Sequence, residues 1–219
     1  MNKIYNKLRN LPQLYLTSAE LAFYLDNTTD SRQSLIKRAV ADGLLIRAKR
    51  KLYYLSDQLT FKKPHPYELA YRLYPPAIIS CESALSYHGL IPETVYVITS
   101  VTPKRRNKFS TSQGNFDYLT VPSRNFMTSV FRIKEGDAIY FMASVWRAIA
   151  DYVYCNKMNW LGHEPLWESL RIEPEELPRI TSEELSSLLD YYQDIRVKKF
   201  LTGIHREQEN DNHSHSKSA

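Results

Sequence analysis

Residues 31–55, SRQSLIKRAVADGLLIRAKRKLYYL, decide the fold, because a helical pattern changes to a strand pattern within them. Apolar residues recur at helical spacing from Leu35 to Val40, and Gly43 follows as a residue that commonly ends a helix. Beyond Gly43, apolar and aromatic runs on both sides of the basic triplet 49–51 predict a two-stranded hairpin with a basic tip. The tip has no Gly or Asn, which tight turns prefer, so we expect a short or irregular hairpin.

Two more helices are predicted before this stretch. Residues 3–10 have one apolar face, and the helix that they form ends before Pro12. The sequence Thr17-Ser-Ala-Glu20 is a capping box, and a second helix runs from it to about residue 26. Three short helices followed by a basic hairpin are the elements of a winged helix-turn-helix, which we predict over residues 1–58.

The start of the third helix carries the side chains expected to contact DNA. In a helix-turn-helix the second helix of the pair enters the major groove, and its first residues reach the base edges. Arginine suits guanine, glutamine suits adenine, and serine contacts bases or phosphate. The predicted duplex contacts are this polar start, two cations one turn later and the cations of the hairpin, namely Ser31, Arg32, Gln33, Ser34, Lys37, Arg38, Arg47, Lys49, Arg50 and Lys51.

The charge distribution agrees with this placement. The formal net charge is +5 and the pI is about 9.0. Residues 1–60 hold ten Lys or Arg against five Asp or Glu, whereas residues 171–219 hold seven against ten. A basic run by itself more often forms a solvated surface. The prediction of DNA binding therefore depends on the order of the elements as well as on their charge.

The cysteines and the apolar runs indicate a cytoplasmic protein. Cys81 and Cys155 match neither a metal-ligand spacing nor a disulfide framework, which favours a reducing compartment. Residues 1–11 are interrupted by Asn, Lys and Arg and do not read as a signal peptide. No apolar run approaches the ~20 residues that a membrane helix needs. We expect no contact with a membrane.

No motif predicts an enzyme. Nucleophile-elbow, zinc-protease and phosphate-binding patterns are all absent, so no catalytic residue, cofactor or metal is predicted. The alternative is a nuclease-like pair of carboxylates on strands, Asp117 and Asp137.

The second region is predicted to be a mixed α/β domain over residues 67–206, after a linker at 59–66, with a small sheet and flanking helices. Ser80 and Gly89 mark the two ends of one helix, in which His88 is expected to be a partly buried hydrogen-bonding residue. Thr181-Ser-Glu-Glu184 is a second capping box and starts a helix that runs towards Phe200.

The remaining elements complete an α+β chain. A further helix is predicted over residues 144–157, and the predicted strands are 95–101, 116–121, 130–133 and 139–142. The polar tail 207–219 is predicted to be disordered.

The most individual segment is Ile79–Arg106, ISCESALSYHGLIPETVYVITSVTPKRR. It resembles the antitoxin family of the AbiE abortive-infection systems, whose members show an S-x-E-S-A-L-x-x-H-G-L-I-P helix, a strand and a T-x-K-R segment. The run GLLIRA after the third helix is also similar to the winged helix-turn-helix of this antitoxin family. The resemblance covers roughly residues 1–157. Where the family has T-P-E-K-A-L-x-D, this chain has ASVWRAIAD at 143–151 and keeps Ala148 and Asp151.

The resemblance implies two functions on one chain. The winged helix would repress its own operon by binding promoter DNA. The second domain, AbiEi-like, would be the antitoxin of a type IV toxin-antitoxin system for phage defence. It would oppose a nucleotidyltransferase-type toxin without forming a stable complex.

Two alternatives stay open for the second domain. Its basic residues Lys104, Arg105, Arg106 and Lys108 are candidates for the antitoxin function, but a solvated loop explains them equally well. The domain would otherwise bind a ligand or a protein partner in a transcriptional regulator with no toxin.

Overall fold

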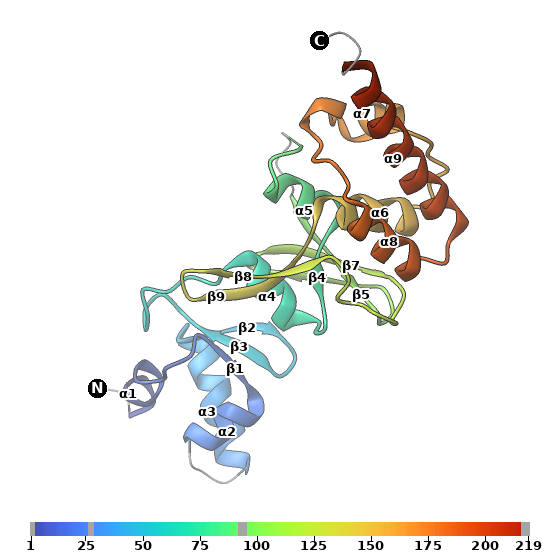
Figure 1. The fold of residues 1–219 in the computed structure, drawn as a ribbon. Helices are drawn as coiled ribbons and strands as arrows, with labels where there is room; N and C mark the ends of the chain where they lie inside the picture. Colours follow the sequence, from blue (N-terminus) through green and yellow to red (C-terminus); the bar gives the residue numbers. More distant parts are fainter. Residues whose placement is uncertain (1–2, 26–28, 92–95, 216–219) are drawn as a thin grey trace. The chain divides into compact units, whose positions relative to one another are not determined.

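A computed structural model describes residues 3–25, 29–91 and 96–215, with the side chains of residues 3, 29–32 and 211–215 left out of the description. The described chain holds nine α-helices and two sheets, so the fold is a mixed α/β one (Figure 1). It separates into two compact units: the first contains residues 1–69 and 110–113, and the second contains 70–109 and 114–219. No helix in the described ranges is both long enough and apolar enough to cross a membrane.

The first unit combines three helices with a three-stranded antiparallel sheet. Its sheet order is β1-β3-β2, so the last strand in sequence lies in the middle. The elements are α1 (Lys3–Arg9), β1 (Tyr15–Thr17), α2 (Ser18–Leu25), α3 (Thr29–Ala41), β2 (Leu45–Lys49) and β3 (Leu52–Leu55). Strand β1 was not predicted, because three residues are too few to show a strand period.

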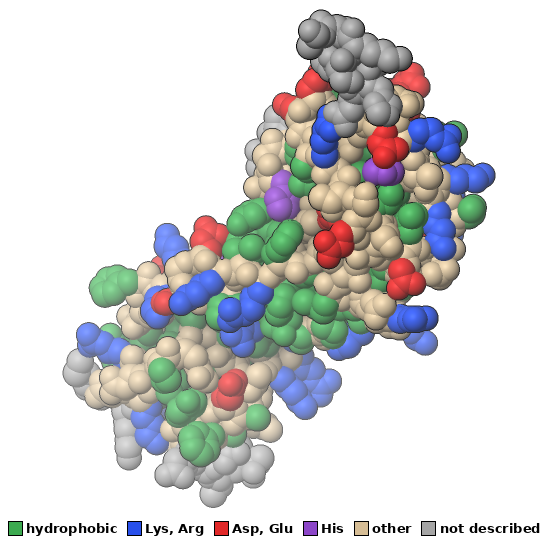
Figure 2. Space-filling view, viewed as in Figure 1, with side chains coloured by type: hydrophobic (Ala, Val, Ile, Leu, Met, Phe, Trp, Pro, Cys, Tyr) green, Lys and Arg blue, Asp and Glu red, His purple; other side chains and the backbone are tan. Residues whose placement is uncertain are grey.

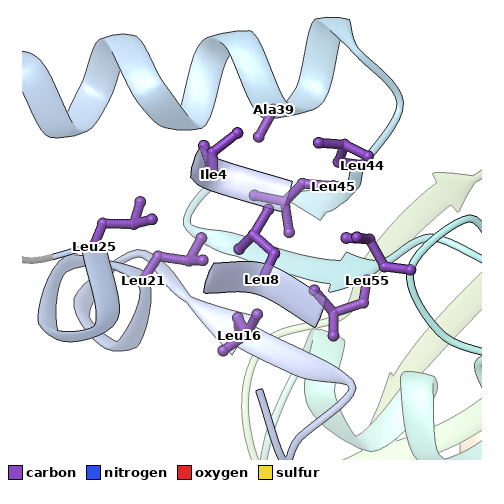
Figure 3. Packing of buried hydrophobic residues seen from close by; sticks show 10 residues of the cluster. Ile4, Leu8, Leu16, Leu21, Leu25, Ala39, Leu44, Leu45 and Leu55 are labelled. Atoms are coloured by element: carbon purple, nitrogen blue, oxygen red, sulfur yellow. The ribbon is translucent and has the colours of Figure 1, made fainter. Parts of the chain in front are cut away.

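Apolar side chains from all of these elements, most of them leucines, form the core of the first unit. Leu8 of α1 is fully buried, and Figure 3 shows it among side chains from the other elements. The labelled members are Ile4, Leu8, Leu16, Leu21, Leu25, Ala39, Leu44, Leu45 and Leu55. Burying them supplies the main stabilisation of a unit this small.

The predicted capping box at the start of α2 is confirmed. The Thr17 backbone N–H donates to Glu20 Oε2 at 2.7 Å, and the Glu20 N–H donates to Thr17 Oγ1 at 3.2 Å. Two backbone donors at the helix start are thereby satisfied.

The second unit is built on a mixed six-stranded sheet with the order β6-β7-β5-β4-β9-β8. The β5–β7 and β4–β9 pairs are parallel, whereas β4–β5 and β8–β9 are antiparallel. The strands are β4 (Ile78–Ile79), β5 (Val97–Thr102), β6 (Asn107–Thr111), β7 (Gly114–Thr120), β8 (Val130–Glu135) and β9 (Ala138–Ala143). Strand β6 was not predicted: it begins at the end of the basic segment 104–108, and its polar sequence shows no apolar period.

Helices of the second unit pack against one another in the upper part of Figure 1, where α6 contacts α5 and α9, and α8 contacts α9. The helices are α4 (Pro66–Leu73), α5 (Cys81–Tyr87), α6 (Val145–Cys155), α7 (Glu164–Leu170), α8 (Ser182–Tyr191) and α9 (Ile195–His215), with a short 3₁₀ turn at Pro174–Glu176. The helix predicted from the second capping box to Phe200 is thus two helices.

A buried ion pair on α6 holds these elements together. Arg147 and Asp151 are one turn apart and both are 0% exposed, with Arg147 Nε 3.0 Å from Asp151 Oδ2. Ser80, just before α5, donates its hydroxyl to Asp151 Oδ2 at 2.6 Å. The Tyr192 hydroxyl, after α8, donates to Asp151 Oδ1. Burial and the neighbouring carboxylate raise the pKa of Tyr192, which therefore remains a donor.

The Arg147 guanidinium uses its other donors on the chain between β7 and β8 and on Tyr191 of α8. Nη1 donates to the carbonyl oxygens of Phe126 at 3.3 Å and Thr128 at 2.8 Å. Nη2 donates to the Tyr191 hydroxyl at 3.0 Å, and the guanidinium lies over that ring at 4.1 Å. A buried charge with this many partners is compensated on all sides.

Two predicted caps have different partners from those expected. Ser80 stands at the N-cap position of α5, but its hydroxyl binds Asp151 and accepts no bond from the helix. Thr181 Oγ1 accepts from the Glu184 N–H at 3.1 Å as predicted. The Glu184 carboxylate, however, accepts from Ser144 Oγ at 2.6 Å, so it links α8 to the start of α6.

The other end of α5 agrees with its prediction. Gly89 follows the helix with φ +77°, the left-handed conformation that glycine adopts readily. His88 is half-buried, and its Nε2 hydrogen-bonds the Ala143 carbonyl oxygen at 2.9 Å. The predicted hydrogen-bonding role of His88 is confirmed.

The tail is a correction, because α9 continues through residues 207–215, which were predicted to be disordered. Glu207 Oε2 accepts from the His163 N–H at 2.9 Å. Gln208 Oε1 accepts from the Ile180 N–H at 3.0 Å. Contacts with segments distant in sequence thus order polar residues that composition alone assigns to disorder. Residues 216–219 lie outside the described chain.

Asp151→Asn is expected to lower the free energy of unfolding of the second unit by about 3–5 kcal/mol, because it leaves the buried Arg147 charge uncompensated. Tryptophan fluorescence in urea measures this unit alone, since Trp146, Trp160 and Trp167 all lie in it.

Asp194→Asn is the matched control. Asp194 pairs with Arg196 at 2.6 Å, but both side chains are partly exposed. Its loss should cost no more than about 1 kcal/mol. Equal losses in the two variants would show that the buried pair has no special role.

Candidate nucleic-acid interface

Helix α3 and the β2–β3 hairpin face the same concavity of about 810 Å³ in the first unit. Six of the predicted DNA contacts line it, three from the helix and three from the hairpin. These are Gln33, Ser34, Lys37, Arg47, Arg50 and Lys51. Helix and hairpin residues that are 10 to 18 positions apart in sequence therefore belong to one surface.

Helix α3 presents this polar edge because its other side packs on the core. Ala39 is fully buried, and Leu35, Ile36 and Val40 are half-buried against the leucine cluster. Gln33, Ser34, Lys37 and Arg38 are exposed. Ile36 and Val40, predicted to face inward, also line the concavity, so its helical wall has both polar and apolar surface.

Gly43 ends the helix and turns the chain into the hairpin. Its φ is +70°, its N–H donates to the Val40 carbonyl oxygen at 3.1 Å, and the Leu44 N–H donates to that of Ala39 at 2.9 Å. This arrangement satisfies the last carbonyl groups of α3. Strand β2 therefore begins two residues after the glycine.

The hairpin is irregular, as its sequence predicted. Lys49 pairs with Leu52, so Arg50 and Lys51 form the turn, and the register shifts between Arg47 and Lys49. Lys51 adopts φ 67°, which a residue with a side chain rarely does. The Lys51 carbonyl oxygen accepts from the Ser18 N–H at 3.0 Å, which links the turn to the start of α2.

Four cations and no carboxylate are among the described residues that line the concavity. On the visible face of the first unit, Figure 2 shows more Lys and Arg side chains than Asp and Glu side chains. The local potential therefore favours a polyanion.

The remaining predicted contacts are placed elsewhere. Arg38 is exposed and Lys49 is half-buried, and neither lines the concavity. The side chains of Ser31 and Arg32 lie outside the description. Sequence reasoning missed Ser18, Ala22 and Tyr53, which also line it. Tyr53 pairs with Arg47 across the hairpin, and that register was its available signal.

The second basic segment is largely occupied by contacts within its own unit. Arg106 Nη2 and Lys108 Nζ lie 3.0 and 3.1 Å from Asp117 Oδ2. Lys104 Nζ lies 5.4 Å from the centre of the Tyr74 ring and donates to a backbone carbonyl. Arg105 is exposed. These residues are side by side, but most of their charge already has a partner.

The structure separates the two carboxylates of the nuclease alternative. Asp117 is on β7, Asp137 is in the turn between β8 and β9, and β5 and β4 stand between them in the sheet. Asp117 is engaged by Arg106 and Lys108. No group of three His, Cys, Asp or Glu within the described ranges is arranged to hold a metal ion.

No family model matches this chain, and none of the curated protein sequences does.

Lys51→Gly is expected to raise the stability of the hairpin by up to about 1 kcal/mol, because glycine adopts the left-handed conformation without steric cost. Hydrogen exchange of the intact protein, read from a digestion peptide that covers residues 45–55, measures the change.

Arg50→Gly is the control, since it removes the same charge from the same turn, where the backbone φ is not positive. It should lower hairpin stability by about 0.5–1 kcal/mol. Two shifts of the same sign would contradict the assigned turn.

Proposed function

We propose that the first unit is a winged helix-turn-helix that binds duplex DNA, and that the chain is a transcriptional autorepressor and antitoxin. The observation that supports DNA binding best is the shared concavity of α3 and the hairpin, lined by Lys37, Arg47, Arg50 and Lys51 without a carboxylate. The three helices and the basic hairpin follow in the order that this class of domain requires.

In this proposal, the first half of α3 lies in the major groove. An α-helix with its side chains is about 10–12 Å across and the groove is about 12 Å wide, so one helix fits. The Gln33 amide then reads adenine through two hydrogen bonds. The methyl groups of Ile36 and Val40 suit contact with thymine.

The cations of the concavity would contact the phosphates of the duplex. Lys37, one turn after Gln33, and Arg47 and Arg50 on the hairpin would lie along the neighbouring backbone. Each phosphate that a cation neutralises releases counterions from the duplex. Binding should therefore weaken steeply as salt rises.

Lys37→Ala/Arg50→Ala is expected to weaken binding to the DNA upstream of the gene on the order of 10- to 100-fold at 0.1 M salt, and to reduce the salt slope by about 2. Fluorescence anisotropy over a salt series measures both. Gln33→Ala in the same assay should reduce the preference for upstream DNA over an unrelated duplex.

Arg38→Ala/Lys49→Ala is the matched control, because it removes two cations from the same helix and hairpin outside the concavity. Its affinity should change no more than about threefold. Similar losses in both double variants would reject the concavity as the contact surface.

The antitoxin half of the proposal depends on the resemblance of Ile79–Arg106 to the AbiE antitoxins. We expect a nucleotidyltransferase-type gene beside this one, whose expression alone stops growth and is tolerated with this chain present. The Lys37→Ala/Arg50→Ala variant should still protect, because neutralisation is assigned to the second unit. A neighbouring gene of another kind would favour a regulator whose second unit binds a ligand or partner.

A further inference from the structure

The two cysteines meet where α5 and α6 pack together. Cys81 is the first residue of α5 and Cys155 is the last of α6. Asp151 and Cys155 are one turn apart on the same face of α6, and Asp151 accepts from Ser80, the residue before Cys81, at 2.6 Å. The face of α6 that carries Asp151 and Cys155 therefore lies against the start of α5, where Cys81 follows Ser80. Helices α5 and α6, which carry the two cysteines, are in direct contact with each other.

The two thiols differ in their access to solvent. Cys81 is 0% exposed, and its backbone has φ 49°. The neighbouring Cys155 side chain, followed by burial, raises the pKa of the Cys81 thiol. Cys155 is half-buried, with its Sγ 3.8 Å from the Thr120 carbonyl oxygen. A small oxidant therefore reaches Cys155 first.

We propose that Cys81 and Cys155 are a redox-active pair that closes to an intramolecular disulfide when a hydroperoxide oxidises the protein. The Cys155 thiolate attacks the peroxide, the O–O bond breaks, and Cys155 becomes a sulfenic acid while an alcohol or water leaves. Cys81 sulfur then attacks the Cys155 sulfur, the S–O bond breaks, and hydroxide leaves with the Cys81 proton as water. Two electrons pass from the thiols to one peroxide.

The raised pKa of Cys81 makes the second step slow, because the thiolate is the nucleophile. The disulfide would join two helices that the Ser80–Asp151 bond already holds together, so closure needs little rearrangement of the unit. A reducing compartment keeps the pair open, and oxidative conditions close it.

The test is hydrogen peroxide treatment of the full chain, followed by denaturation, thiol alkylation and mass spectrometry. The chain has two cysteines, so any internal disulfide joins them. We expect both alkylatable thiols to be lost without formation of a covalent dimer, and dithiothreitol to restore both. The melting temperature followed by tryptophan fluorescence should rise in the oxidised protein.

Single variants distinguish this pair from a lone reactive cysteine. Cys81→Ser should trap Cys155 as a sulfenic acid that reacts with dimedone. Cys155→Ser, at the more exposed position, should fold and keep the Cys81 thiol under the same treatment. Wild-type protein that keeps both thiols, oxidises Cys155 beyond the sulfenic acid, or links two chains through Cys155 would overturn the proposal.

Discussion

The Arg147–Asp151 ion pair is the interaction on which the second unit depends. Two charges with no exposed surface are tolerated inside a protein when every donor and acceptor has a partner. Their partners come from the start of α5, from the chain between β7 and β8, and from the end of α8. Segments distant in sequence must therefore be in place together, which makes the pair a specific constraint on how the helices are placed.

The first unit depends instead on a small leucine core. Because one side of α3 packs on that core, the opposite side is left with Gln33, Ser34 and Lys37 in solvent. The hydrogen bond from the Ser18 N–H to the Lys51 carbonyl oxygen links the turn of the hairpin to the start of α2. The turn that carries the hairpin cations is therefore fixed by its two strands and by the start of α2. A surface that is already ordered loses less conformational entropy when it binds a partner.

The two units also differ in how they use charge. In the first, cations line an open concavity free of carboxylates among its described residues, which suits an external anion. In the second, the exposed basic residues Arg106 and Lys108 are paired with Asp117. We therefore propose DNA binding for the first unit only, because the second basic segment contributes less free charge than its sequence indicates.

The sequence by itself determined the three helices, the basic hairpin and the first capping box, because these follow from local periodicity, from glycine and from side chains three residues apart. It also predicted most strands of the larger sheet. Tertiary structure alone decided that Ser80 binds Asp151, that Glu184 binds Ser144 and that residues 207–215 continue α9. Each of these depends on partners far away in the chain. A local pattern shows which groups a residue can offer, whereas packing determines which partner it meets.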